Sequence, residues 1–231
     1  EYDQYGNITY KKGVGQYYYE TDDPFKLTRL EEENGENRDF SYDLNGNLLS
    51  DGVREFEYQS NRLVHVARYD SQDNNIVERD ETRFTYGPDG QQIVRTDKRF
   101  DIATLEWATT KTLSTGAYSY TQKDGESSAQ ESFGGNGFSV SCNESLCGTA
   151  YSHTDRLGQR IMVTGSEGDI TSQTFTDPFG ATHNILLPEM DDAFAVSTAY
   201  SSMFGHVGVA GFDLIHMKGR VYDPYLARFI Q

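Results

Sequence analysis

Acidic residues are the first candidates for chemistry in this chain, because 36 Asp and Glu side chains stand against 20 Lys and Arg. Residues 43–47 (DLNGN) space oxygen-bearing side chains like the start of a calcium-binding loop. The glycine comes too early for such a loop, however, and no Glu stands at the twelfth position. We therefore interpret Asp43 and Gly46 as parts of a tight turn, and we predict no metal site and no cofactor.

Five histidines, at positions 65, 153, 183, 206 and 216, are the next candidates. They form neither an HExxH motif nor a close pair, which favours structural or surface roles. His153-Thr154-Asp155 could supply a base and its orienting carboxylate, but no serine stands at a Gly-x-Ser-x-Gly elbow. No spacing singles out a carboxylate pair of the glycosidase kind. We therefore predict no catalytic residue and a protein that is not an enzyme.

Two cysteines, Cys142 and Cys147, have four residues between them. One interpretation is a disulfide across a short hairpin loop, formed if the chain reaches an oxidising compartment. The other is a pair of small buried hydrophobic side chains. Without a second pair or nearby histidines, the two cysteines cannot make a structural zinc site.

The last part of the chain, residues 214–229, alternates apolar, aromatic and cationic side chains around a Gly-Arg step and an Asp-Pro corner. Arginines in such a strand can pair with carboxylates and stack on tyrosines of neighbouring strands. We interpret the segment as a structural motif that fixes the closure of a sheet. Its members are Gly219, Arg220, Tyr222, Asp223, Pro224, Arg228 and Phe229.

Internal repeats are the main signal for the elements that position these residues. Residues 2–9 (YDQYGNIT) recur as 42–49 (YDLNGNLL), with looser copies at 69–76, 86–93 and 175–180. Each copy joins an aromatic residue, a turn, a Gly or Asn that tolerates positive φ, and apolar residues, which together predict a hairpin. The turn motif of the repeat comprises Tyr42, Asp43, Gly46, Asp177, Pro178 and Gly180.

The segments between the turns predict strands. Residues 54–58, 62–69 and 82–86 alternate in polarity, as strands with one buried face do. The composition agrees, with 16 Tyr, 13 Phe and 22 Gly, 36% hydrophobic residues and a mean hydropathy of −0.68. Helical periodicity favours one helix, over residues 189–203. The sequence therefore predicts an all-β fold, a repeat-built, twisted antiparallel sheet of hairpins.

We predict a single architectural unit over residues 1–231. Hairpin repeats fill residues 1–120, a polar loop or insertion fills the Gly-rich residues 121–137, and residues 138–231 form a further region that includes the C-terminal motif. The first residues lie inside a repeat and do not resemble a signal peptide, so we expect a piece of a longer protein.

The formal net charge of −16 disfavours two classes of partner, so we predict no nucleic-acid binding. Such a surface repels the phosphates of nucleic acids and the anionic surface of membranes. No run approaches 18 apolar residues, so the sequence predicts no membrane-spanning helix.

These motifs resemble those of bacterial Rhs/YD-repeat proteins. The tyrosine-aspartate repeats match the repeat that names the family, and residues 151–158 (YSHTDRLG), 163–170, 176–180 (TDPFG) and 211–229 follow in the order usual for its members. Family members often have Gly at the position of Ala227. This departure is mild on size, because Ala has the next smallest side chain.

The resemblance implies a β-sheet strip that spirals into a hollow shell around a toxic C-terminal domain. The function would then be structural, to encapsulate a toxin polypeptide and help deliver it, in a secreted or exported protein. The implied partners are the remainder of the shell, the enclosed toxin and, through open sheet edges, a second copy. In the family a self-cleaving aspartate segment follows the C-terminal signature, and we expect it beyond Gln231.

Two other functions stay open. Related β shells in animal teneurins serve adhesion, so a carbohydrate- or receptor-binding module is the alternative, which exposed rows of aromatic residues would favour. A hydrolase acting through paired carboxylates is the third interpretation.

Overall fold

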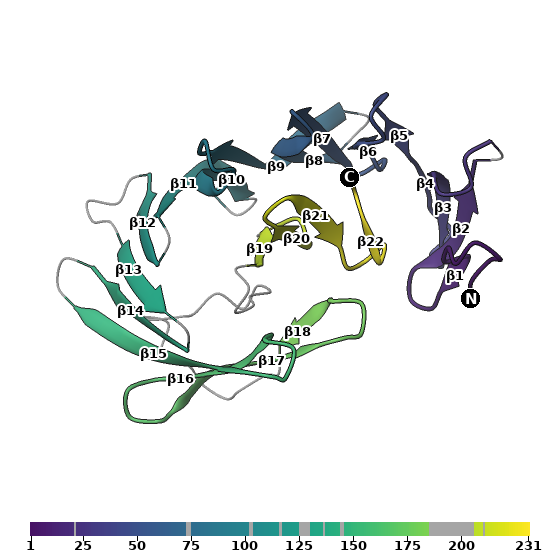
Figure 1. Cartoon of the computed structure of the whole chain (residues 1–231). Coiled ribbons are helices and arrows are strands. Elements are labelled where there is room, and N and C mark those ends of the chain that lie inside the picture. Colours follow the sequence, from purple (N-terminus) through teal and green to yellow (C-terminus); the bar gives the residue numbers. More distant parts are fainter. Residues whose placement is uncertain are drawn as a thin grey trace. The chain divides into compact units, whose positions relative to one another are not determined.

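The computed structural model describes residues 1–20, 22–72, 75–101, 104–115, 117–124, 130–135, 137–143, 146–184, 206–209 and 211–231. Every regular element in these ranges is a β-strand, and the pairs between named strands are antiparallel (Figure 1). This confirms the predicted all-β fold of antiparallel hairpins. The helix predicted over residues 189–203 lies outside the described residues.

The chain divides into two compact units, residues 1–81 with 230–231 (unit 1) and residues 82–229 (unit 2). The boundary falls within strand β9 (Asn75–Tyr86). The prediction of a single unit with region boundaries at residues 120 and 137 stays a prediction.

Unit 1 contains two runs of paired strands. One sheet has the order β1-β2-β3-β4, and the strands β5 to β8 then pair in sequence order. Leu27, Leu30 and Val66 are fully buried in the core of this unit. The strands are β1 (Tyr10–Lys11), β2 (Gly15–Tyr19), β3 (Leu27–Glu32), β4 (Asn37–Asp39), β5 (Ser41–Tyr42), β6 (Leu48–Ser50), β7 (Arg54–Gln59) and β8 (Arg62–Gln72).

Unit 2 also contains two runs. Strands β10 to β18 pair in sequence order, and a separate sheet has the order β19-β20-β21-β22. The strands of the first run are β10 (Gln92–Asp101), β11 (Glu106–Thr115), β12 (Tyr118–Lys123), β13 (Gln130–Gly135), β14 (Phe138–Cys142), β15 (Cys147–Thr154), β16 (Arg160–Thr164), β17 (Ile170–Thr176) and β18 (Thr182–Asn184). Those of the second are β19 (Val207–Val209), β20 (Leu214–Met217), β21 (Arg220–Asp223) and β22 (Arg228–Phe229).

The prediction of a polar loop over residues 121–137 is wrong for much of that segment. Thr121–Lys123 complete β12, and β13 pairs with both β12 and β14. The reason is that Ser, Thr and Gly occupy strand positions throughout this part of the sheet. Polar composition therefore does not distinguish a strand from a loop here.

The strands β10 to β15 have two chemically different faces, because directly paired residues share a face and successive residues alternate. Phe100 pairs with Trp107, Leu113 with Tyr120, and Phe138 with Tyr151, and we call the face they share the aromatic face. The positions between them are charged in β10 and carry many small hydroxyl residues in β11, β12, β14 and β15, and we call this side the hydroxyl face. Its paired residues include Thr112 and Thr121, Ser114 and Ser119, and Ser139 and Ala150.

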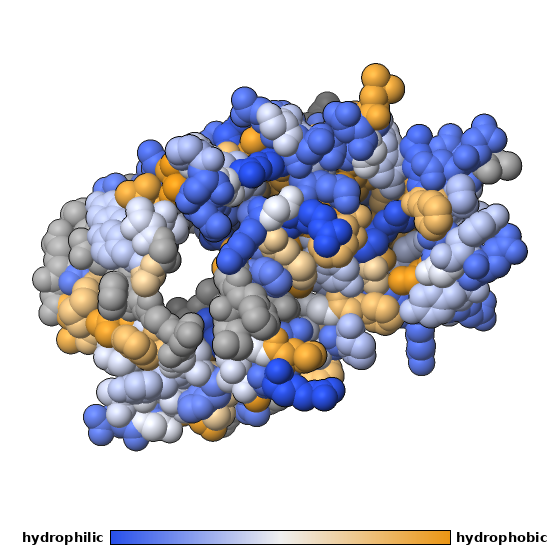
Figure 2. Space-filling model, in the orientation of Figure 1, coloured by the Kyte–Doolittle hydropathy of each residue, from blue (hydrophilic) through white to orange (hydrophobic). Residues whose placement is uncertain are grey.

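The aromatic face is the exposed one. Trp107, Phe138 and Tyr151 are 44%, 41% and 46% exposed. The hydroxyl face is less exposed: most of its described residues in β11, β12, β14 and β15 are half-buried, and Ser152 pairs with the buried Val163 of β16. Figure 2 shows apolar residues at the surface among hydrophilic ones over this part of unit 2.

Candidate functional site

The predicted C-terminal motif builds the strands β20, β21 and β22. Lys218, with a φ of +63°, and Gly219, whose N–H donates to the Met217 carbonyl at 2.8 Å, form the turn between β20 and β21. The Arg220 guanidinium lies 3.9 Å from the centre of the Phe229 ring, and the Tyr222 ring meets Phe229 edge-on at 5.2 Å. The predicted cross-strand stacking of arginine on an aromatic ring is therefore present, with phenylalanine as the partner.

Asp223 and Pro224 turn the chain from β21 into β22. Asp223 is fully buried, and its Oδ1 accepts the backbone N–H of Leu226 at 2.9 Å. In the backbone register Asp223 stands opposite Arg228. This carboxylate is engaged in holding a corner of the sheet.

The second Asp-Pro motif of the chain packs against the first. Asp177 Oδ1 accepts the N–H groups of Phe179 and Ala181, which closes a turn that ends in Gly180 with a φ of +91°. A Cβ on Gly180 would lie 3.3 Å from Ile215 and 3.5 Å from Tyr222. The structure thus brings together two motifs that lie about 45 residues apart in the sequence, and a side chain at Gly180 would be disfavoured by the positive φ and by close contact with Ile215.

The β19–β22 sheet also packs on strands β9 and β10. The Arg99 guanidinium lies 5.2 Å from the ring centre of the buried Phe212. It also lies close to Gly211, because a Cβ added to Gly211 would be 2.8 Å from Arg99 Nε. His216 Nε2 and the Tyr86 hydroxyl are 2.8 Å apart. Burial lowers the pKa of His216 to about 4, with Arg95 and His206 adding to the effect. His216 is therefore neutral near pH 7 and serves as a packed hydrogen-bonding ring.

Sequence reasoning missed the polar cluster that fixes Arg99. Thr82 donates from its hydroxyl to Asp97 Oδ1 at 2.7 Å, and Arg99 Nη2 donates to the Thr82 hydroxyl at 3.1 Å. Arg95 Nε is 2.7 Å from Asp97 Oδ2. The sequence did contain a sign of this cluster. Arg95, Asp97 and Arg99 occupy every second position of one strand, which places all three on one face.

The predicted Asp-led turns share one hydrogen-bonding pattern. Asp43 Oδ1 accepts the N–H groups of Asn45 and Asn47, Oδ2 accepts the Asn47 side-chain amide, and Gly46 has a φ of +84°. Asp3 makes the corresponding bonds at the first repeat. The Asn47 hydrogen bond is the main cause that holds the pKa of Asp43 below its ordinary value. Both carboxylate oxygens are occupied within the turn, as the interpretation of a plain turn requires.

Tyr42, which precedes this turn, is half-buried in β5, and Lys26 Nζ lies 5.8 Å from the centre of its ring. The looser repeat at residues 69–76 includes Asp73 and Asn74, which lie outside the described residues. His153 and Asp155 do not act on each other: His153 Nε2 is 3.0 Å from the Thr164 hydroxyl, and Asp155 Oδ1 accepts the N–H groups of Leu157 and Gln159. His153 thus lies in the strand β15, and Asp155 closes the turn that follows it.

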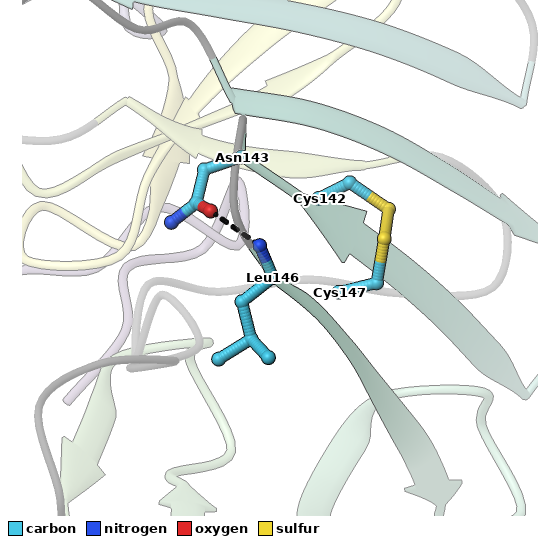
Figure 3. Close-up of a disulfide and its surroundings, with 4 residues drawn as sticks. All are labelled: Cys142, Asn143, Leu146 and Cys147. Atoms are coloured by element: carbon cyan, nitrogen blue, oxygen red, sulfur yellow. Dashed lines mark hydrogen bonds between the residues drawn. A yellow bond between two sulfur atoms is a disulfide. The ribbon is translucent and has the colours of Figure 1, made fainter.

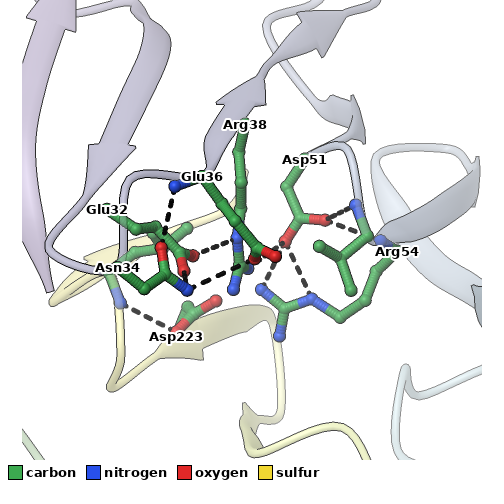
Figure 4. Close-up of polar contacts among 9 residues, drawn as sticks. Glu32, Asn34, Glu36, Arg38, Asp51, Arg54 and Asp223 are labelled. Carbon is green, nitrogen blue, oxygen red and sulfur yellow. Dashed lines mark hydrogen bonds and ion pairs between the residues drawn. The ribbon is translucent and has the colours of Figure 1, made fainter. Parts of the chain in front are cut away.

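A buried ionic network occupies unit 1, and the sequence did not indicate it. Asp51 is fully buried and accepts hydrogen bonds from Arg54 Nε at 2.8 Å and Nη2 at 2.6 Å. Arg38 pairs with Glu32 and approaches Asp51 at 4.0 Å (Figure 4). The network thus joins the β3–β4 hairpin to the turn between β6 and β7. In the same unit His65 lies between Glu57 and Glu81, at 3.2 and 3.1 Å.

Cys142 and Cys147 form a disulfide, so the first of the two cysteine interpretations is the one the structure shows (Figure 3). They are opposite each other at the end of the β14–β15 hairpin. The Asn143 side chain accepts the N–H of Leu146 at 2.9 Å within the connecting loop. The bond therefore closes a hairpin end that hydrogen bonds also hold.

Among the described residues, no group of three or more His, Cys, Asp or Glu is arranged to hold a metal ion. No described helix has the length and apolar character needed to cross a membrane.

Together these features define an antiparallel sheet whose strands are joined by repeated, hydrogen-bonded Asp-led turns. In unit 2 a small C-terminal sheet packs on it. No family model and no curated protein matches the chain. Among solved structures, it is similar to a TcdB2-TccC3 crystal structure, with a TM-score of 0.60 and 15% identity over 94% of this chain. It is also similar to the Tc holotoxin pore of Photorhabdus luminescens, with a TM-score of 0.62 and 15% identity.

A third similar structure is TcdB2-TccC3 without its hypervariable C-terminal region, at a TM-score of 0.55 and 16% identity. This chain covers only 12% of the length of each of these proteins. At sequence identities of 15–16%, the similarity to these structures shows that the fold is shared and no more.

Proposed function

We propose that this chain is a segment of a β-sheet wall that encloses a toxin polypeptide and helps to deliver it. The observation that carries the proposal is the match of 94% of the chain to structures of Tc toxin components. The order of the sequence motifs, which resembles that of Rhs/YD-repeat proteins, supports it independently. The partners would be the rest of the wall and the enclosed polypeptide.

We propose further that the role is structural and not catalytic. The two Asp-Pro carboxylates, of Asp177 and Asp223, are both engaged in turns by backbone N–H groups. A general acid or a nucleophile needs a carboxylate that can reach a substrate, and Asp223 is fully buried. This engagement favours a structural role for these two aspartates.

An exported protein fits the disulfide of Cys142 and Cys147. Disulfides persist in oxidising compartments, whereas cytosolic reductants keep thiols reduced. Mass spectrometry after alkylation of the protein from its native host tests this point. Two blocked cysteines support export, and two alkylated thiols would contradict it.

Protease protection tests the wall itself. The protein is isolated at the length its host makes, digested with proteinase K with and without urea, and mapped by mass spectrometry. We expect peptides from outside residues 1–231 to survive digestion in buffer and to disappear in urea. Absence of any protected peptide from outside this segment, in a protein shown to be folded by circular dichroism, would overturn the proposal.

A pair of variants sharpens this experiment. Phe212→Asp places a charge at a fully buried position under the β19–β22 sheet, and we expect it to abolish the protection. Phe175→Asp makes the same change at a position that is 57% exposed, and protection should persist. Equal protection in both variants would show that the enclosure does not depend on the C-terminal sheet.

A further inference from the structure

The aromatic face of β10 to β15 reverses the usual pattern of an antiparallel sheet. Such a sheet normally turns its apolar residues to the core and its polar residues to water. Here Trp107, Leu113, Phe138 and Tyr151 are all more than 40% exposed, while most of the described hydroxyl-face residues of β11, β12, β14 and β15 are half-buried. Exposed apolar side chains that gather on one face of a folded protein are typical of binding surfaces, and these four share a face.

The charges on this face differ in sign from those of the whole chain. Lys98 pairs with Thr109, and Lys111 pairs with Thr96 and Gln122, so both lysines share the aromatic face, and both are exposed. The acidic residues Asp97, Asp101 and Glu106 fall on the hydroxyl face.

One acidic residue, Glu131, holds a register position on the aromatic face, opposite Tyr120. Among the positions of this face in β10, β11, β12, β14 and β15, none is acidic, in a chain of net charge −16.

The rings and the lysines are interleaved. The pair Phe100 and Trp107, with ring centres 5.4 Å apart, lies two residues along the strands from Lys98. Lys111 comes next, and the pair Leu113 and Tyr120 follows it. A ligand along these strands would therefore meet rings and ammonium groups in turn.

We propose that the aromatic face binds an acidic polysaccharide. The face of an aromatic ring carries partial negative charge and attracts the C–H groups on one side of a sugar ring, and an ammonium group pairs with a uronic carboxylate. Thr96, Thr109 and Gln122 add groups that hydrogen-bond to sugar hydroxyls. An open face that offers many weak contacts in a row suits a polymer, whose repeats bind together. This binding does not depend on the proposed wall.

Trp107, the one tryptophan of the chain, supplies the readout. The protein is titrated with polygalacturonate, with neutral dextran and with polyglutamate while Trp107 fluorescence is recorded. We expect a saturable change with polygalacturonate that weakens as salt is added, because the lysine contacts are screened. Dextran and polyglutamate should each bind at least tenfold more weakly, since one lacks charge and the other lacks sugar rings. Equal binding of polyglutamate, or no response to polygalacturonate, would overturn the proposal.

Matched variants locate the site. The double variant Lys98→Gln with Lys111→Gln should bind polygalacturonate about tenfold more weakly, and Tyr151→Ser should also weaken binding. Lys123→Gln removes an exposed charge from the hydroxyl face and should leave the affinity unchanged. If Lys123→Gln weakened binding as much as the double lysine variant does, the binding would be general charge attraction without a defined site, and the proposal would be wrong. Sedimentation completes the test: a mass that doubles with concentration and falls in Tyr151→Ser would identify a second copy as the occupant and would contradict the polysaccharide.

Discussion

Ala227 adopts a φ of +56°, in the left-handed region of backbone conformation. It lies in the turn between β21 and β22, close to the buried Asp223. A non-glycine L-residue in this region costs about 1 kcal/mol, because its Cβ approaches the following carbonyl. The preference for glycine at this place of the motif therefore has a backbone cause. We expected alanine to be a mild departure because its side chain is small, but the backbone conformation at this position matters more than the size of the side chain.

Replacing Ala227 by glycine should raise the free energy of unfolding by about 0.5–1 kcal/mol, since relief of the backbone strain outweighs the added flexibility of glycine. Urea denaturation followed by circular dichroism measures the change. Ala108→Gly, in the strand β11, is the matched control and should lower stability. A loss of stability in both variants would contradict the argument.

Asp43 gives unit 1 a stability that depends on pH. The pKa of Asp43 is lowered in the folded protein from its ordinary value of 3.8, mainly by the hydrogen bond from Asn47. A lowered pKa means that the contribution is fully present above the unfolded value and is lost as the pH falls through the folded value. Asp43→Asn should therefore lower the urea midpoint above about pH 4, and the difference from the native protein should shrink towards zero in stronger acid.

The control for Asp43 is Asp22→Asn, which changes the charge equally at an exposed side chain. It should shift the urea midpoint little at any pH. If the urea midpoints of Asp43→Asn and the native protein differed by the same amount at pH 2 and pH 7, the ionised carboxylate would not stabilise the turn.

At the scale of elements, the ionic network of unit 1 links the β3–β4 hairpin to the β6–β7 turn. Asp51→Ala would leave the buried Arg54 without its carboxylate, and such a loss costs about 3–5 kcal/mol. Urea denaturation should show this drop, and the exposed Asp39→Ala should show less than about 0.5 kcal/mol. A small effect at Asp51 would mean that water reaches the network readily.

The Cys142–Cys147 disulfide should stabilise the β14–β15 hairpin modestly, because it closes a very short loop. The double variant Cys142→Ser with Cys147→Ser should lose about 2 kcal/mol. A dithiol reductant should lower the urea midpoint of the native protein and leave that of the double variant unchanged. An unchanged native midpoint would show that the hydrogen-bonded loop holds the hairpin end alone.

Local patterns allowed much of this fold to be predicted. Alternation over residues 54–58 and 62–69 predicted β7 and β8, and the Asp-led turns follow from contacts within five residues. The missed features depend on residues that are distant in sequence, such as Thr82 with Asp97 and Arg99 with Phe212. Which face of β10 to β15 is the more exposed was likewise beyond reach, because alternation defines two faces and does not say which one faces water.

At the scale of the whole chain, its last two residues belong to unit 1. Ile230 is buried, and its carbonyl accepts the Leu48 N–H at 3.0 Å and the Tyr58 hydroxyl at 3.4 Å. Burial also raises the pKa of Tyr58, so its hydroxyl stays a donor at ordinary pH. Unit 1 is thus completed by residues that follow unit 2 in the sequence.

Ile230→Asp should therefore destabilise unit 1 by about 3 kcal/mol, because a carboxylate would replace a buried apolar side chain. Hydrogen–deuterium exchange should show faster exchange of the Leu48 amide, while the amides of β14 and β15 keep their rates. Gln231→Asp, at the half-buried neighbouring position, is the control. Unchanged exchange at Leu48 would contradict the assignment of the chain end to unit 1.

The Asp-led turns have a consequence for how such chains change during evolution. Each turn binds both oxygens of its own carboxylate, as Asp3 and Asp43 show, and its Asn amide makes one further hydrogen bond outside the turn, to the Pro24 carbonyl or to Asn61. Duplication or loss of a whole hairpin then disturbs few hydrogen bonds beyond its own turn. A chain built this way can alter the length of its sheet in steps while keeping its architecture.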